Sequence, residues 1–274
     1  MPITNANGID LYYEIHGEGE PLLLIMGLGL NSKSWFRTLP ALSKQYKVII
    51  FDNRGTGSSG KPNTPYSIEL MADDTRAVLD AAEIDSAHVY GISMGGMIAQ
   101  RFAIKYPERT RSLILGCTTS GGIKHVQPGA EVSMMMLSRG SATATPEEIA
   151  WATVPILYSR DFIENYRDLV AEDIQRRVEV PVMPYAYLLQ LQACLGHDTY
   201  SEINQIKVPV LVIHGNADRL VPYENGVTLA DNIQNAELLT INGAGHIYVT
   251  EANDFVNERC LNLHHFLISK HPSK

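Results

Sequence analysis

Residues 87–106 place a serine between an apolar segment and a segment with the pattern of a helix. Residues 87–91 are typical of a buried strand, and residues 94–106 are typical of a helix that packs on it. Ser93 lies between them in the sequence Gly-Ile-Ser-Met-Gly, which matches the Gly-x-Ser-x-Gly pattern of a nucleophile elbow. Such a turn is sharp, and glycine two positions before and after the serine removes side chains that would collide. We therefore expect a strand, a tight turn that exposes the Ser93 hydroxyl, and a helix.

The rest of the chain decides whether this pattern is meaningful. Three fixed positions among common residues also occur by chance, so an ordinary serine between a strand and a helix is the alternative interpretation. Further apolar segments are typical of buried strands, at 22–26, 48–51, 111–117, 208–215 and 236–241. Helices are expected between them, including 34–45 and 67–82. Strands that alternate with helices predict an α/β fold whose sheet is mostly parallel and is covered on both faces.

This alternation stops between residues 118 and 200, where no convincing buried strand occurs. Helices are expected there at 146–152, 159–178 and 184–194. We predict a core domain formed by residues 1–120 and 201–274, and a helical cap, or lid, formed by residues 121–200. Because the cap carries clustered methionine, leucine and tyrosine, we expect a mostly apolar roof that favours an uncharged or weakly polar acyl group.

The composition is that of an ordinary globular protein. The chain has 274 residues, 45% hydrophobic residues and a formal net charge of −8. The acidic balance predicts no nucleic-acid partner, and no apolar run reaches the length of a membrane span. No secretory signal is visible at the N-terminus, and Cys117, Cys194 and Cys260 lack the spacing of a metal site, so we expect a cytoplasmic protein with free thiols and no bound metal. The oligomeric state is not predicted.

Two loops supply partners that could activate Ser93. A serine hydroxyl needs a base to accept its proton and an acid to orient that base. Asp218 follows the expected strand 208–215, and His246 follows the expected strand 236–241 after a glycine-rich loop. The order serine, aspartate, histidine is the order of the triad in hydrolases with an elbow of this kind. We predict that these three residues are catalytic.

Other residues compete for these roles. Asp198 and Asp231 are alternative acids, but neither follows a predicted strand. Among the nine histidines, His214 ends a strand behind the loop of Asp218 and is expected to be a scaffold residue.

An acyl-transfer site also needs two donors for the oxyanion. We expect these to be the backbone N–H groups of Met94, which follows the nucleophile, and of Leu28, which lies between two glycines. The residues expected to contact the substrate are Leu28, Met94, Met134, Tyr187, Val221 and Ile247.

Residues 52–60 form a glycine-rich loop with two interpretations. A phosphate cradle would need the Walker spacing and a lysine before serine or threonine, which this loop lacks. A tight structural loop held by Asp52 and Arg54 is favoured.

Taken together, these motifs identify a resemblance to the α/β-hydrolase superfamily along nearly the whole chain. The resemblance rests on residues 26–29, 52–58 and 91–95, together with Asp218 and His246. Residues 8–17 are similar to the branch that contains 3-oxoadipate enol-lactonases, small esterases and cofactor-free haloperoxidases. That branch usually has histidine where this chain has Met26, which weakens assignment to one subgroup.

The resemblance implies an α/β-hydrolase fold with a mostly parallel eight-stranded sheet, and no metal or organic cofactor. It implies a serine esterase of the carboxylesterase or lactonase type that cleaves a small-molecule ester or lactone through an acyl-enzyme intermediate. Alternatives with the same triad are a C–C bond hydrolase, a cofactor-free haloperoxidase or perhydrolase, and a ligand sensor with little turnover.

Overall fold

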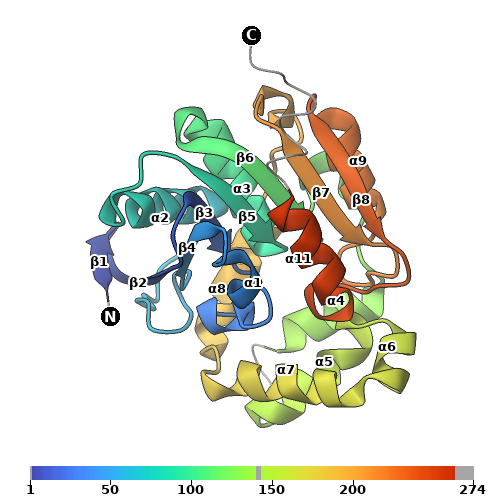
Figure 1. Ribbon diagram of the computed structural model, residues 1–274. Coiled ribbons are helices and arrows are strands. Elements are labelled where there is room, and N and C mark those ends of the chain that lie inside the picture. The colour runs from blue at the N-terminus through green and yellow to red at the C-terminus, as the bar shows by residue number, and fades with distance from the viewer. Residues whose placement is uncertain (1, 140–142, 263–274) are drawn as a thin grey trace.

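A computed structural model describes residues 2–139 and 143–262 and contains one eight-stranded sheet (Figure 1). The strand order is β1-β2-β4-β3-β5-β6-β7-β8. The strands β1 and β2 pair antiparallel, as do β2 and β4, whereas all the other pairs are parallel. The expected α/β-hydrolase fold class is therefore confirmed. The strands are β1 (Ile3–Ala6), β2 (Ile9–His16), β3 (Glu20–Ile25), β4 (Tyr46–Phe51), β5 (Ala87–Ile92), β6 (Thr110–Gly116), β7 (Val210–Gly215) and β8 (Ala236–Ile241).

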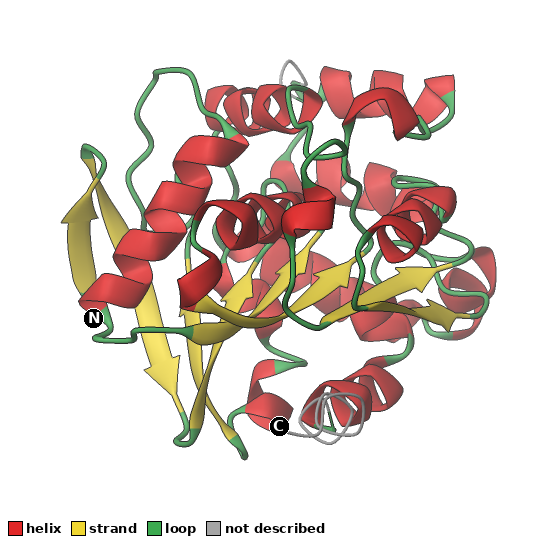
Figure 2. Cartoon of the chain, turned by 90° about the horizontal axis from the view of Figure 1, so that it is seen from above, coloured by secondary structure: helices red, strands yellow, loops and turns green. Residues whose placement is uncertain are grey.

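Helices cover both faces of this sheet, as Figure 2 shows from above. One face packs against α2 (Ile68–Ala81), α3 (Met94–Lys105) and α9 (Glu224–Asn232). The other face packs against α1 (Leu39–Leu42), α10 (Tyr248–Glu251) and α11 (Asn253–Leu261). Every residue of β5 and β7 is buried. This double cover explains why the strands read as continuous apolar runs rather than as alternating ones.

The glycine-rich loop 52–60 is a structural loop, as expected. Asp52 accepts hydrogen bonds from the backbone N–H groups of Ser32 and Ser58, each at 2.7 Å. The guanidinium of Arg54 forms a buried pair with both carboxylate oxygens of Asp74, at 2.6 and 2.7 Å. The bond to Ser32 fixes the loop against the chain that follows β3, and the pair with Asp74 fixes it against α2.

The helix expected at 34–45 is not continuous. A 3₁₀ turn, η1 (Ser32–Trp35), comes first and is capped by Asn31, whose side chain accepts from the N–H of Lys33. The short helix α1 begins only at Leu39, with Pro40 in its first turn. Proline lacks an N–H and is tolerated at the start of a helix but not inside one, so this prediction was wrong. The other 3₁₀ turns are η2 (Pro107–Arg109), η3 (Gly122–Lys124) and η4 (Ile203–Gln205).

Residues 121–200 leave the sheet after β6 and return before β7. Their described part contains five helices, which lie together at one end of the molecule in Figure 1. They include a small apolar core of their own around Val154, Phe162 and Val170. The helix expected at 159–178 is two helices, which are separated at Tyr166. The helix at residues 130–138 was not expected. The five are α4 (Ala130–Ser138), α5 (Pro146–Leu157), α6 (Arg160–Asn165), α7 (Arg167–Glu179) and α8 (Pro184–Leu195).

None of the helices within residues 2–139 and 143–262 combines the length and the apolar character needed to cross a membrane. Residues 263–274 of the expected core segment lie outside the described residues.

Candidate active site

Ser93 lies in the sharp turn between β5 and α3, with φ 57° and ψ −120°. This left-handed conformation is rare for any residue other than glycine and is typical of strained functional sites. The turn requires glycine on both sides. A Cβ added at Gly91 would lie 2.1 Å from the carbonyl oxygen of Gly95, and one added at Gly95 would lie 2.1 Å from that of Ile25. The N–H of Ser93 donates to the Gly116 carbonyl at 2.8 Å, which ties the turn to β6.

His246 and Asp218 lie together at the carboxyl ends of β8 and β7. The distance between His246 Nδ1 and Asp218 Oδ2 is 2.7 Å. The other oxygen, Asp218 Oδ1, accepts from the N–H groups of Leu220 and Val221 at 2.8 and 2.9 Å. Burial alone would raise the pKa of Asp218, but the His246 and His214 rings outweigh it and lower this pKa to about 2. Asp218 is therefore an ionised acceptor that holds the His246 ring in one orientation.

The alternative acids do not occupy this place. Within the described residues, neither Asp198 nor Asp231 bonds to His246: Asp198 accepts from the Tyr200 N–H, and Asp231 is exposed on α9. His214 lies behind the loop of Asp218, where its Nε2 is 2.8 Å from the Val221 carbonyl oxygen. This contact fixes the acid loop, in agreement with the scaffold role expected for His214.

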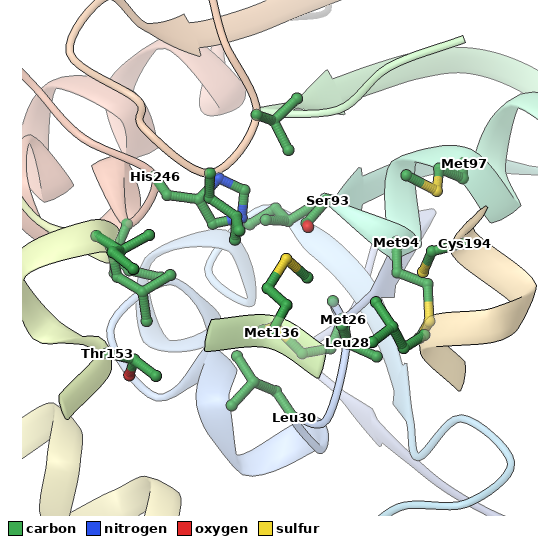
Figure 3. Close-up of a pocket in the computed structure, with 18 of the residues that line it drawn as sticks. Met26, Leu28, Leu30, Ser93, Met94, Met97, Met136, Thr153, Cys194 and His246 are labelled. Atoms are coloured by element: carbon green, nitrogen blue, oxygen red, sulfur yellow. The ribbon is translucent and has the colours of Figure 1, made fainter. Parts of the chain in front are cut away.

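Ser93 and His246 line the same cavity and lie on the same side of it in Figure 3. No hydrogen bond joins the Ser93 hydroxyl to His246 in the part of the chain that the structure describes. The closest partner recorded for His246 Nε2 is Cys117 Sγ, at 3.9 Å. The hydrogen bond that would join nucleophile and base is therefore not formed in this conformation, and such bonds often tighten only in the reacting complex.

The residues expected to supply the oxyanion donors, Leu28 and Met94, both line the cavity. A Cβ added at Gly27 would lie 3.2 Å from that of Ser93, so the loop carrying Leu28 runs directly beside the serine. The loop is held from two sides: Asn53 donates to the Met26 carbonyl at 2.9 Å, and the Gly29 N–H donates to Gln190 of α8 at 2.8 Å. Among the described groups, no acceptor takes the N–H of Leu28 or of Met94. Both are free to bind an oxyanion.

The cavity has a volume of about 530 Å³. Four of the residues expected to contact substrate line it, namely Leu28, Met94, Val221 and Ile247. These come from the loops after β3, β5, β7 and β8, at the edge of the sheet where ligands of α/β proteins bind.

Two of the residues expected to contact substrate, Met134 and Tyr187, do not line this cavity. Met134 is 71% exposed on α4, whereas its neighbours Met135 and Met136 line the cavity. Successive residues of a helix point about 100° apart, so a methionine run has members on different faces. Tyr187 is 2% exposed but does not line the cavity; its hydroxyl donates to the Met136 carbonyl at 3.1 Å, so it supports α4 from behind.

The sequence reasoning missed a charged group in the lining. Four arginines reach the cavity, one of them from the core and three from residues 121–200: Arg37, Arg139, Arg176 and Arg177. Asp173 lines the cavity too, so the expectation of a mostly apolar roof needs correction at this end. The adjacent arginines of α7 were visible in the sequence, but the pattern gave no sign that either one faces inward.

Cys117, Asp218 and His246 offer ligand atoms within 4.8 Å of one another, which makes them a possible metal cluster. Burial raises the pKa of the Cys117 thiol well above its usual range, so the thiolate that a metal prefers is disfavoured. Asp218 Oδ2 is already bonded to His246. The arrangement fits an acid and a base better than a metal site.

The comparisons with known proteins agree with this geometry. A family described as alpha/beta hydrolase fold matches residues 20–252. The chain belongs to the alpha/beta hydrolase family. It is 34% identical over 264 residues to a putative carbamate hydrolase RutD from Azorhizobium caulinodans, covering 95% of this chain and 97% of that one. It is also 32% identical to a poly(3-hydroxyalkanoate) depolymerase from Ectopseudomonas oleovorans, covering 84% and 78%.

Solved structures share the whole fold. An enol-lactonase from Burkholderia xenovorans is 28% identical and has a TM-score of 0.83, with 95% of this chain and 98% of that chain covered. The family and these relatives support assignment of this protein as a hydrolase.

Proposed function

We propose that this alpha/beta hydrolase cleaves a carboxylic ester or lactone through an acyl-enzyme intermediate on Ser93. The observation that carries the proposal is the arrangement at one cavity wall. A strained, accessible serine shares the cavity with a histidine, and the far nitrogen of that histidine is 2.7 Å from a buried carboxylate. This is the set of groups that activates a serine hydroxyl in serine hydrolases.

In the proposed first step, Ser93 Oγ attacks the carbonyl carbon of the substrate. His246 Nε2 accepts the hydroxyl proton and then gives it to the departing alcohol oxygen. Asp218 keeps the Nδ1 proton in place and stabilises the imidazolium cation that forms. For this step the Ser93 hydroxyl must form a hydrogen bond to His246 Nε2, which is not present among the described residues.

The carbonyl oxygen becomes an oxyanion in the same step. In the proposal it is bound by the N–H groups of Leu28 and Met94, which have no other acceptor among the described residues. A water molecule activated by His246 then attacks the acyl group on Ser93 and releases the acid. The loss of one oxyanion donor typically costs about 10²–10³ in rate, so this loop is central to the proposal.

We further propose that α4–α8 act as a cap that sets specificity. Residues of α4, α5, α7 and α8 contribute to the cavity lining. The chemistry would come from the loops of the sheet, and the shape and charge of the acyl site from the cap.

Carbamate hydrolysis is a second candidate, favoured by the 34% identity to the putative carbamate hydrolase. A carbamate ion has only a few atoms, whereas the cavity holds about 530 Å³. A cavity of this size fits a drug-sized or fatty acyl substrate better, so ester or lactone cleavage is the first candidate.

The test is an activity panel of esters of increasing acyl length, lactones, methyl esters and carbamate, with wild type and Ser93→Ala. Ser201→Ala, an exposed serine outside the cavity, is the matched control. Multiple turnover of an ester or lactone that falls by several orders of magnitude in Ser93→Ala alone is the expected result. Turnover of carbamate alone would overturn the proposal in favour of carbamate hydrolysis, and turnover of nothing in the panel would overturn it in favour of a ligand sensor.

A further inference from the structure

The charges at the cap end of the cavity are not balanced. Arg37 is paired with Glu172 and Asp173, at 2.6 and 3.0 Å, and Arg176 is paired with Glu179 at 3.2 Å. Arg139 and Arg177 also line the cavity. Neither has a carboxylate oxygen within 4.0 Å in the described part of the chain. The residues outside it, 1, 140–142 and 263–274, include no Asp or Glu side chain.

The contacts of these two arginines leave their charges unneutralised. Within the described residues, the Arg177 side chain forms one hydrogen bond, from Nη1 to the Thr153 hydroxyl at 3.5 Å. The Arg139 guanidinium stacks on the Tyr187 ring, with its Cζ 4.5 Å from the ring centre, and its buried Nε has no hydrogen-bond partner. Both therefore keep donors available toward the cavity.

The acidic group near Arg177, Asp173, offsets its charge only in part. Asp173 Oδ1 accepts a hydrogen bond from Arg37, and Asp173 Oδ2 accepts from the hydroxyls of Tyr158 and Thr250, each at 2.7 Å. Burial and the charge of Arg139 lower the pKa of Arg177 to about 10. Arg177 is partly buried. A partly buried cation without a carboxylate partner is costly, and a bound anion would reduce that cost.

We propose that Arg139 and Arg177 form a subsite for a carboxylate carried by the substrate, at the end of the cavity away from Ser93. A guanidinium matches a carboxylate through two parallel N–H···O bonds, which makes arginine the preferred partner for this group. The inference rests on the proposed ester or lactone hydrolysis and adds that the acyl group is a dicarboxylic acid with one free end.

The placement of Thr153 gives the subsite its position. Thr153 contacts Arg177 and lies across the cavity from Ser93 in Figure 3, with Met136 between them. A substrate would therefore place its ester at Ser93, its apolar chain beside Met136 and its carboxylate at the arginines.

The kinetic test compares p-nitrophenyl monoesters of succinic, glutaric and adipic acid with neutral esters of matched chain length. Arg177→Met and Arg139→Met should each lower kcat/KM for the best monoester by about ten- to a hundred-fold, because each removes a hydrogen bond to a charged group. The neutral esters should change less than about twofold. Arg177→Lys should keep part of the preference. Arg160→Met, which removes an exposed arginine paired with Glu164, should leave both series unchanged.

A binding test separates this inference from the proposed reaction. Isothermal titration of glutarate into Ser93→Ala, with and without Arg177→Met, needs no turnover. Glutarate should bind to the parent and at least about tenfold more weakly to the double variant. If no ester is cleaved but this binding difference holds, the subsite stands and the reaction fails. Equal glutarate binding, or an equal loss for anionic and neutral esters, would overturn the subsite.

Discussion

Ser93 adopts a backbone conformation that its neighbours impose. Its N–H and carbonyl are held by the Gly116 carbonyl and by the Thr118 hydroxyl, at 2.8 and 2.7 Å. These bonds and the close packing at Gly91 and Gly95 offset the strain of a positive φ. The sequence predicted this turn well, because a turn with so little space for side chains tolerates few residue types at positions 91 and 95.

Gly95→Ala should therefore abolish the elbow. The added Cβ would meet the Ile25 carbonyl oxygen at 2.1 Å, and backbone cannot move aside as a flexible side chain can. We expect a loss of at least about 2 kcal/mol in the free energy of unfolding and a large loss of activity. Urea unfolding checks this, with Gly129→Ala as control because nothing lies within 4 Å of that position. Equal stability of the two variants would contradict the account of the turn.

His197 should make stability depend on pH. Burial, together with the charge of Arg101, lowers the pKa of His197 to about 3, whereas an exposed histidine has a pKa of about 6.5. As pH falls below about 6.5, the unfolded chain binds a proton that the folded chain does not, so stability is lost.

Between pH 7 and 5 the loss due to His197 should be about 2 kcal/mol. His197→Gln should flatten this part of the profile, measured by urea unfolding at each pH, whereas His16→Gln, at a partly exposed edge position, should not. If the free energy of unfolding of His197→Gln falls as steeply between pH 7 and 5 as that of wild type, His197 is not the cause of the pH dependence.

Glu251 of α10 shows how one element connects the cap region with the His246 loop. It accepts hydrogen bonds from the Ser159 N–H and hydroxyl, at 3.0 and 2.5 Å, and from the Gly245 N–H at 3.0 Å. The Ile247 N–H also donates to the Leu157 carbonyl at 3.0 Å. Ile247, after His246, is thus bonded directly to the end of α5, and Gly245, before it, is linked through Glu251 to Ser159.

Glu251→Gln replaces one acceptor oxygen with an NH₂ group that cannot accept. We expect a loss of about 1–3 kcal/mol in the free energy of unfolding and a lower kcat, because the His246 loop loses its support. Urea unfolding and ester kinetics check both, with the exposed Glu164→Gln as control. If the two variants have the same stability and the same kcat, Glu251 does not support the His246 loop.

At the level of elements, prediction succeeded where hydrophobic pattern and caps agree. The helix α2 follows its N-cap Ser67, which accepts from the Leu70 N–H at 3.1 Å, as expected. Prediction failed where short-range pattern does not decide the outcome. The helix α4 carries both exposed and cavity-facing methionines, and the inward side of α7 is fixed by Asp173 and its partners rather than by any local signal. For this reason Arg177 could not be assigned to the site from sequence.

Ser93, Asp218 and His246 follow strands of the sheet, whereas helices α4, α5, α7 and α8 contribute other residues to the same cavity. Because each of the three residues follows a predicted strand, the sequence was sufficient to place all of them at the carboxyl edge of the sheet. Which side chains line the cavity depends on how helices α4–α8 pack against the sheet. The periodicity of the sequence does not predict that packing.

Exchange of residues 121–200 for the corresponding segment of a relative should change the ester preference. Because the elbow and the loops of Asp218 and His246 belong to the core, labelling of Ser93 by a fluorophosphonate should persist in the chimera. The measurement is the ratio of kcat/KM across acyl lengths and charges. An unchanged ratio would show that the core, not the cap, sets specificity.

The central claim, covalent catalysis by Ser93, is tested most directly by mass spectrometry of rapidly quenched reactions with p-nitrophenyl acetate. The account predicts a transient acetyl group on the peptide that contains Ser93, formed at a rate equal to or faster than turnover. Ser93→Ala should show neither the adduct nor turnover. Near-wild-type turnover in Ser93→Ala, or an acetyl group that accumulates on a different residue, would contradict it.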